Sequence, residues 1–221
     1  MIRRNPITGA PVLLAPERLL RPHALGGDEE IVCPFCPGNE PETPPEIWRD
    51  GDPWSIRVVP NKYPVTDRHE VVVETADHDA RFEDLDHAAR IVDAWLDRYR
   101  ALSPAIIFKN HGRAGGASLQ HAHSQILGTP FVPPRLAAEA AAFARAQHCP
   151  LCHVGDEPLV RESEHYRVIA PRGSAFAYEH WIVPRTHAHD VGEPHELSSL
   201  LQSAARASCK VAPGFNWIFN T

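Results

Sequence analysis

GASLQHAHSQILGTP, residues 116–130, places His121, His123 and Gln125 at alternate positions. In a β-strand alternate residues share one face, so these three side chains would point the same way. A half-polar strand facing solvent would also produce this alternation. However, the apolar runs AIIFKN before it and ILGTPFVPP after it favour an interior strand, where imidazole groups need hydrogen-bond partners. We therefore expect a functional strand inside a sheet.

A glycine-rich segment, HGRAGGAS at residues 111–118, leads into this strand. Backbone N–H groups of such a turn, together with the hydroxyl of Ser118, are the usual means of holding phosphate oxygens. A neutral imidazole is a competent nucleophile toward phosphorus, and it forms a phosphoramidate that divides one transfer into two steps. The combination predicts a site for a phosphorylated ligand.

Charge and composition exclude several classes of protein. The chain has 221 residues and a formal net charge of −6 without a long basic block, which argues against general nucleic-acid binding. No apolar run approaches the ~18 to 20 residues that cross a bilayer. The start of the chain, MIRRNPITGAPVLL, lacks a sustained apolar region and a small-residue cleavage site. We expect a soluble cytoplasmic protein with neither nucleic-acid nor membrane partners.

Four of the five cysteines form two C-x-x-C pairs, CPFC (Cys33, Cys36) and CPLC (Cys149, Cys152). In a reducing compartment such a pair is a metal knuckle or a redox pair before it is a disulfide. Thioredoxin-like chemistry requires the pair to open a helix after a strand, whereas both pairs here lie in loops rich in proline, glycine and acidic residues. The sequence therefore predicts zinc. Cys209, in an amphipathic helix, is expected to be a small buried side chain.

The order of predicted elements occurs twice along the chain. Each copy begins with a C-x-x-C pair and continues with two β-rich runs, a helix and a strand. In the first copy these are residues 54–64, 69–78, 83–102 and 105–110; in the second they are a run over residues 165–187, a helix over 194–211 and FNWIFNT at 215–221. An alanine-rich helix, RLAAEAAAFARAQ, leads to the second pair.

This repeat predicts an α+β fold made of a duplicated β-β-α-β unit, with antiparallel sheets and helices packed on one face. We expect one domain over residues 1–135 and a second over 136–221. The second copy ends where its counterpart of residues 116–130 would begin, so it is expected to be incomplete at its C-terminus.

His121 and His123 need not share a role. A pair of cysteines leaves a tetrahedral zinc two ligands short, and His78 and His121 are the best candidates to close a structural Cys2His2 site around Cys33 and Cys36. His123 would then be available for catalysis. Its second ring nitrogen would need an acceptor, commonly a backbone carbonyl, to hold the correct tautomer.

Motifs spread over nearly the whole chain carry a family resemblance. They are RRNPITGAPVLLAPERLLRP, CPFCPGNE, WSIRVVPNKYP, ETADHDARFEDL, IIFKNHGRAGGASLQHAHSQ and the second CPLC. In this order they resemble the galactose-1-phosphate uridylyltransferase branch of the histidine-triad superfamily, and especially its sub-branch that contains ADP-glucose phosphorylases. The resemblance implies the duplicated histidine-triad fold.

The resemblance also implies roles for individual residues. His123 would be the nucleophile that takes the nucleotidyl group, and Gln125 would hydrogen-bond its phosphate so that the intermediate survives for an acceptor. Nucleotide and phosphate contacts would come from Arg18, Arg21, Asn61, Asn110, Gly116 and Ser118. Surface charge remains an alternative for the two arginines, which in some members approach from a neighbouring subunit, and a turn position remains one for Asn61.

A second metal site is implied less completely. Cys149, Cys152 and His187 match three ligands, and the fourth is expected on the strand that the second copy lacks. Water, His148 or His189 could supply the last position, or the site could bind no metal.

The function implied by the resemblance is nucleotidyl transfer from a nucleoside-diphosphate sugar through a covalent nucleotidyl-histidine. The uridylyltransferase form exchanges UMP between UDP-glucose and galactose 1-phosphate. One alternative uses inorganic phosphate as acceptor, as in a phosphorylase of ADP-glucose or dinucleoside polyphosphates. Another is a zinc-stabilised nucleotide-binding module without turnover. The resemblance also implies a homodimer. It places hexose contacts in a C-terminal segment that this sequence lacks, which leaves the acceptor open.

Overall fold

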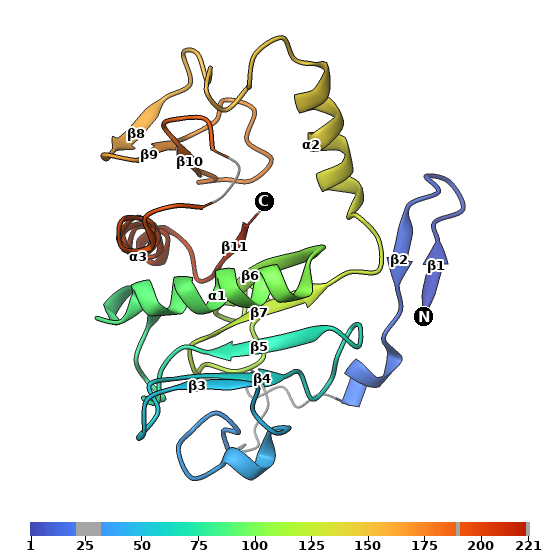
Figure 1. Ribbon diagram of the computed structural model, residues 1–221, viewed down its shortest axis with the longest axis vertical. Helices are drawn as coiled ribbons and strands as arrows, with labels where there is room; N and C mark the ends of the chain where they lie inside the picture. Colours follow the sequence, from blue (N-terminus) through green and yellow to red (C-terminus); the bar gives the residue numbers. More distant parts are fainter. Residues whose placement is uncertain (21–31, 189–190, 220–221) are drawn as a thin grey trace.

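The computed structural model describes residues 1–20, 32–188 and 191–219 (Figure 1). The elements of the first half are β1 (Ile2–Arg4), β2 (Pro11–Leu13), η1 (Pro16–Leu20), η2 (Glu40–Glu42), β3 (Trp48–Asp50), β4 (Ile56–Pro60), β5 (His69–Val73), η3 (Phe82–Asp84), α1 (Ala88–Leu102), β6 (Ala105–His111) and β7 (His123–Gly128). Those of the second half are α2 (Pro134–Arg145), β8 (Leu159–Glu162), β9 (Tyr166–Ile169), β10 (Trp181–Pro184), α3 (Pro194–Val211) and β11 (Phe215–Phe219).

The main sheet is antiparallel and six-stranded, in the order β11-β6-β7-β5-β4-β3. Strand β7, which carries His123 and Gln125, lies inside it, between β5 and β6. Its register sets Gln125 opposite Val71 and His123 opposite Val73. The predicted interior strand is confirmed, except that it begins at His123, so His121 lies two residues before it.

One face of this sheet is covered by α1 and α3 (Figure 1). The large apolar side chains there form one cluster, which includes Ile56, Val58, Val72, Ile107 and Ile126 from the strands, Ile91, Val92 and Trp95 from α1, and Leu197, Leu200 and Leu201 from α3. The buried side chains of each helix recur at helical spacing, so burial of one apolar stripe explains their position. Antiparallel strands with helices on one face confirm the predicted α+β class.

The opposite face of the sheet carries the site. A smaller apolar cluster lies there, made of Phe35, Trp54, Val59, Val71 and Val73. The alternation of β7 separates its side chains between the two faces. Ile126 belongs to the helix-covered cluster, and Ser124 Oγ accepts a hydrogen bond from Trp95 Nε1 of α1 at 2.5 Å. His123 and Gln125 therefore face away from α1, and the His123 ring lies 5.3 Å from the ring of Phe35.

Helix α1 begins five residues later than the predicted limit of residue 83. The carbonyl oxygens of Phe82 and Leu85 accept only turn-type backbone bonds, from the N–H groups of Leu85 at 3.3 Å and Ala88 at 3.4 Å. They also accept from Gln202 Nε2 of α3 at 3.1 and 2.8 Å, where an earlier helix would use them for its own hydrogen bonds. Leu85 is buried with extended backbone rather than in a helical turn. A contact from the second half of the chain thus outweighs the local helical pattern.

The two halves share one order of elements. Strands β3, β4 and β5 precede α1 and β6, and strands β8, β9 and β10, which form a separate three-stranded sheet, precede α3 and β11. Strand β11 joins the main sheet against β6, with Ile107 opposite Phe219 and Phe108 opposite Ile218. In the sequence repeat, Ile218 corresponds to Ile107 and Phe219 to Phe108. The two strands thus pair equivalent segments in antiparallel directions, as happens across a two-fold axis.

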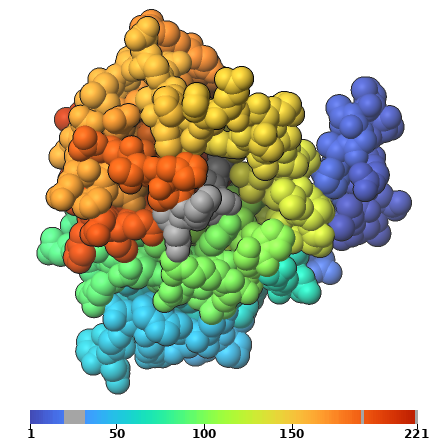
Figure 2. Space-filling view, turned by 45° about the horizontal axis from the view of Figure 1, so that its top comes forward, coloured from blue at the N-terminus to red at the C-terminus, as the bar shows by residue number. Residues whose placement is uncertain are grey.

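The β1–β2 hairpin projects from the side of the molecule (Figure 2). Ile7, in its turn, is 93% exposed. Among the described residues no helix has the length and apolar content needed to span a bilayer.

Candidate active site and metal centre

Four side chains of the first half converge on one point. They are Cys33, Cys36, His78 and His121, and their ligand atoms all lie within 4.8 Å of one another. Cys33 Sγ and Cys36 Sγ lie 3.5 and 3.6 Å from His121 Nδ1, and Cys36 Sγ lies 3.2 Å from His78 Nδ1. Such separations match the edges of a tetrahedral Cys2His2 site.

The surroundings of this cluster suit a metal ion. His121 is fully buried, and its Nε2 donates to the Thr75 carbonyl oxygen at 2.8 Å, which leaves the Nδ1 lone pair directed at the cysteines. Burial lowers the pKa of His121, so its ring is neutral as a ligand must be. Burial also raises the pKa of Cys33 to about 11, and a bound cation is what would hold that sulfur as thiolate. The residues therefore fit zinc.

His123 is held in one orientation by the residue two positions before it. Its Nδ1 lies 2.8 Å from the backbone carbonyl oxygen of His121, which can only accept, so the proton is on Nδ1. In the neutral ring Nε2 then carries the lone pair. His121 consequently has two functions: its ring faces the metal cluster, and its carbonyl sets the tautomer of His123.

The amide oxygen of Gln125 accepts from two neighbours. His69 Nε2 lies 3.0 Å from it and Asn61 Nδ2 lies 3.4 Å from it. Asn61 is itself oriented by the Tyr63 N–H, which donates to its Oδ1 at 2.9 Å. The predicted pair of Asn61 and Gln125 is thus brought together, and His69 is a neighbour that the sequence interpretation missed.

Of the two predicted arginines, only Arg18 can be described. Its Nη1 donates to the Tyr63 carbonyl oxygen at 2.6 Å, so its guanidinium lies beside the turn that carries Asn61 in the same chain. Arg21 lies outside the described residues. Arg18 therefore lies close to Asn61, and its contact with a nucleotide stays a prediction.

The glycine-rich segment packs closely against the second half of the chain. Gly116 has a φ of +79°, and a Cβ built on it would lie 3.9 Å from Asn110 Nδ2. A Cβ on Gly115 would lie 2.3 Å from the His111 carbonyl oxygen and 2.6 Å from that of Phe215, so no other residue fits there.

Two further site residues, Asn110 and Ser118, lie at the ends of this segment. Asn110 Oδ1 accepts from Asn216 Nδ2 of β11 at 2.7 Å. The second half therefore orients one of the predicted nucleotide-binding residues. Ser118, predicted to contact phosphate, is buried.

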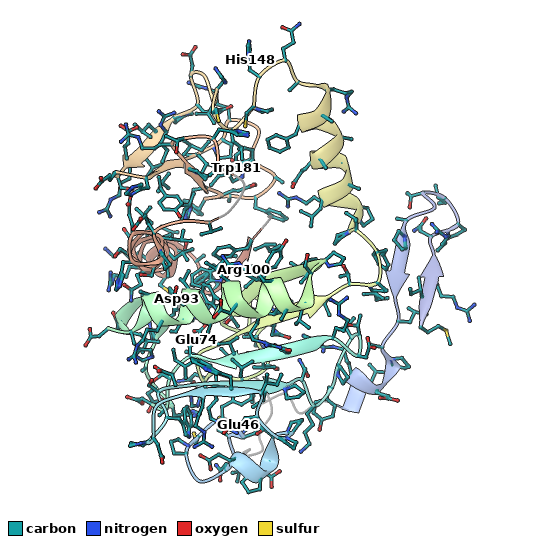
Figure 3. All side chains as sticks on the ribbon, in the orientation of Figure 1. Glu46, Glu74, Asp93, Arg100, His148 and Trp181 are labelled. Atoms are coloured by element: carbon teal, nitrogen blue, oxygen red, sulfur yellow. The ribbon has the colours of Figure 1, made fainter. Side chains whose placement is uncertain are left out.

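A buried ion pair lies behind strand β7 and was not foreseen. Lys109 Nζ lies 2.5 Å from Glu74 Oε2 and donates to the His123 carbonyl oxygen at 3.0 Å. Glu74 is labelled in Figure 3. Both side chains are almost fully buried. The sequence does hold a signal, because Lys109 interrupts the apolar face that Ala105 and Ile107 begin on β6. The pair anchors the backbone of the strand at His123.

The second cysteine pair lies in a less complete cluster. Cys149, Cys152 and His187 have ligand atoms within 4.8 Å of one another, and His187 is exposed. His187 Nδ1 lies 3.6 Å from Cys152 Sγ. These three residues could hold a metal ion, but within the described part of the chain no fourth Cys, His or acidic ligand belongs to the group. His189, one of the alternatives for that position, lies outside the described residues.

Comparison with known proteins gives the family. The model for the N-terminal domain of galactose-1-phosphate uridyl transferase matches residues 57–133. The chain is 30% identical to galactose-1-phosphate uridylyltransferase of Thermotoga maritima over 84% of its own length and 67% of that protein. It is 29% identical to ADP-glucose phosphorylase of Arabidopsis thaliana over 100% of its own length and 78% of that protein.

Comparison with solved structures finds relatives of the same kind as the sequence comparison. The crystal structure of an ADP-glucose phosphorylase from Arabidopsis thaliana with bound ADP-glucose matches 99% of this chain and 80% of that one, with a TM-score of 0.77 and 30% identity. The matched residues 57–133 include β7 and the glycine-rich segment described above. The chain belongs to the galactose-1-phosphate uridylyltransferase family.

Proposed function

We propose that this protein is a nucleotidyltransferase that transfers a nucleoside monophosphate from a nucleoside-diphosphate sugar through a covalent intermediate on His123. The observation that carries the proposal is the hydrogen bond from His123 Nδ1 to the His121 carbonyl oxygen at 2.8 Å. It makes Nε2 the nitrogen with the lone pair, and a neutral imidazole nitrogen is the nucleophile that this chemistry requires.

In the first step Nε2 of His123 attacks the α-phosphorus of the donor. A nitrogen–phosphorus bond forms, the bond from that phosphorus to the bridging oxygen breaks, and the sugar 1-phosphate leaves with the electron pair. In the second step a phosphate oxygen of the acceptor attacks the same phosphorus and the nitrogen–phosphorus bond breaks. The proton stays on Nδ1 of His123 throughout and donates to the His121 carbonyl oxygen, a hydrogen bond that stabilises the positive charge developing on the ring.

Gln125, Ser118 and the backbone of Gly116 supply donors for phosphoryl oxygens, and Arg18 supplies positive charge beside Asn61. Zinc held by Cys33, Cys36, His78 and His121 would supply structure rather than reactivity, because four protein ligands close its coordination sphere. Its consequence for catalysis is rigidity of His121, whose carbonyl orients the nucleophile.

The acceptor we propose is a hexose 1-phosphate, as in the uridylyltransferases. Inorganic phosphate is a second candidate, supported by the similarity to an ADP-glucose phosphorylase over the whole chain. Both acceptors use the same nucleotidyl-histidine, so they differ only in the second step.

The experiment uses UDP-glucose and ADP-glucose, each labelled at the α-phosphate, in separate reactions with the purified protein. We expect an acid-labile label on the protein and release of glucose 1-phosphate. His123→Ala should reduce labelling by at least about a thousandfold, as loss of a nucleophile does. His165→Ala, an exposed histidine of the second half, should label normally.

Later addition of galactose 1-phosphate or of inorganic phosphate would discharge the label and identify the acceptor. If the wild type binds these nucleotides but never becomes labelled, the protein is a zinc-stabilised binding module without turnover, and the proposal is wrong.

A further inference from the structure

His69 opens strand β5 and lies directly beside Gln125. Its side chain is buried, with 3% exposure. In the ladder of β5 and β7 His69 is opposite Leu127 and Val71 is opposite Gln125, so His69 and Gln125 are diagonal neighbours on one face of the sheet. A buried imidazole at this position must satisfy both ring nitrogens.

The protonation of this ring follows from one backbone contact. The Val65 N–H donates to His69 Nδ1 at 3.1 Å, and a backbone N–H cannot accept. Nδ1 therefore carries the lone pair, and the proton of the neutral ring is on Nε2. Since Nε2 lies 3.0 Å from Gln125 Oε1, His69 donates to the amide oxygen of Gln125.

The same turn orients the second donor to this oxygen. The Tyr63 N–H donates to Asn61 Oδ1 at 2.9 Å, which turns Asn61 Nδ2 toward Gln125 Oε1 at 3.4 Å. Asn61 Nδ2 also lies 3.3 Å from His69 Nε2, but because both nitrogens carry protons they are neighbouring donors and not partners of one another. Two backbone N–H groups thus direct both His69 and Asn61 at one oxygen atom. With its oxygen engaged by two donors, the Gln125 amide presents its NH2 group to a ligand.

We propose that His69 is a positioning residue that holds the Gln125 amide with its N–H bonds toward the phosphoryl oxygens of the His123 intermediate. This inference rests on the proposed function. An amide turned by 180° would present its oxygen to negatively charged phosphoryl oxygens, and repulsion would replace a hydrogen bond that stabilises the intermediate and its transition states. His69 touches no reacting atom and acts only through Gln125.

Packing alone is the competing explanation for His69, because its ring also lies 6.5 Å from the ring of Phe108. A packing role predicts lower stability with an effect that does not depend on Gln125. A positioning role predicts an effect that requires the Gln125 amide. The two roles are therefore separated by a double-mutant cycle.

The experiment measures the rate of label formation from α-phosphate-labelled UDP-glucose or ADP-glucose, whichever labels the wild type, in single turnovers. His69→Ala should slow labelling about 10- to 100-fold, the usual cost of losing a group that orients a functional one. His69→Gln should restore most of the rate, because its Nε2 can donate from nearly the same place. In a Gln125→Ala background, His69→Ala should have no effect beyond about twofold.

A control is available in His87, a partly buried histidine whose Nε2 donates to the backbone carbonyl oxygen of Glu74 at 2.7 Å. His87→Ala should lower the melting temperature but leave the labelling rate close to that of the wild type. If His69→Ala slows labelling equally with and without Gln125, or if His69→Gln restores nothing, the positioning role is wrong while the nucleotidyltransferase proposal stands.

A second measurement needs no turnover. Nitrogen-15 NMR of the imidazoles should find His69 neutral with its proton on Nε2, and the signal should be assigned by its loss in His69→Gln. A proton on Nδ1 would overturn the inference whatever the activity. A wild type that never becomes labelled would overturn the proposed function and the positioning role with it.

Discussion

The two C-x-x-C segments have the same pattern but different surroundings. In the first, the ring nitrogens of two histidines from other loops approach the cysteines to between 3.2 and 3.6 Å, and His121 is fully buried. In the second, one exposed histidine, His187, completes a group of three. The motif therefore specifies the kind of ligand, whereas the fold determines how many ligands meet and how far the site is shielded from water.

The thiol pKa values also differ between the two pairs, being higher in the more buried one. Burial raises the pKa of Cys33 to about 11. For Cys149, hydrogen bonds, first from the Cys152 backbone and then from His187, lower the pKa to about 7. Without a cation Cys33 is expected to be a thiol, and Cys149 to be largely thiolate slightly above neutral pH.

The greatest loss of stability is expected from a substitution in the first cysteine–histidine cluster, and a much smaller one from the same substitution in the second. Cys36→Ser should release the metal of the first site and lower the free energy of unfolding by on the order of 5 kcal/mol or more, because binding of a structural zinc is coupled to folding. Cys149→Ser should cause a much smaller loss, since that cluster is more exposed and has three ligands. Metal content per chain and thermal unfolding check both variants, and similar losses in the two would contradict the comparison.

The two cysteine pairs should also differ in how fast their thiols are alkylated. In metal-depleted protein that keeps its circular dichroism, iodoacetamide at pH 7.5 should modify Cys149 on the order of 50-fold faster than Cys33, because more thiolate outweighs its lower nucleophilicity. Mass spectrometry of peptides gives the two rates. Cys209, whose thiol pKa is raised by burial, is an internal reference that should also react slowly. Equal rates at Cys33 and Cys149 would show that burial does not protect Cys33.

The smallest effect concerns an exposed ion pair of the second half, His165 Nδ1 to Glu196 Oε2 at 2.6 Å. Hydrogen bonds from Ser163 and the His165 backbone lower the pKa of Glu196 from 4.5 to about 2, and the Glu196 hydrogen bond raises the pKa of His165 above 6.5. The glutamate contribution is present above pH 4.5 and is lost as pH falls toward 2. The histidine contribution is complete below pH 6.5 and is lost as pH rises through its raised pKa.

The pair should therefore stabilise the protein most between pH 4.5 and 6.5. The melting temperature of the wild type minus that of Glu196→Gln, followed against pH, should be largest in this window. The difference should also shrink at high salt, because exposed charges are screened. A difference that is constant from pH 3 to 8 would rule out the ion pair as its cause.

Several elements and site residues could be predicted because their signals are local. Helix α3 runs from Pro194 to Val211, as its pattern predicts. The alternation at His121, His123 and Gln125 and the spacing of each cysteine pair also needed only neighbouring residues. The start of α1 could not be predicted, because Gln202, more than a hundred residues away, engages the carbonyl oxygens of Phe82 and Leu85. His69 and Lys109 were missed for the same reason: their partners lie on other strands.

The domain limits at residues 135 and 136, the roles of the site residues and the homodimer stay predictions. The structure adds that the halves share a sheet, since β11 pairs with β6, and that Asn216 of the second half bonds Asn110 of the first. The glycine-rich segment is packed between them, with Gly115 against the backbone of Phe215.

Local sequence patterns were enough to identify the chemical groups of this protein: two cysteine pairs, a strand that alternates histidine, histidine and glutamine, and a glycine-rich segment that leads into it. Spacing along one chain is enough for that, because a strand repeats every two residues. The folded structure was needed to show which nitrogen of His123 carries the proton and which end of the Gln125 amide is hydrogen-bonded. It was also needed to show which cysteine pair meets two histidines in a buried site. Each of these depends on a hydrogen-bond partner or a buried environment that distant segments supply, and a pattern of neighbours contains no record of them.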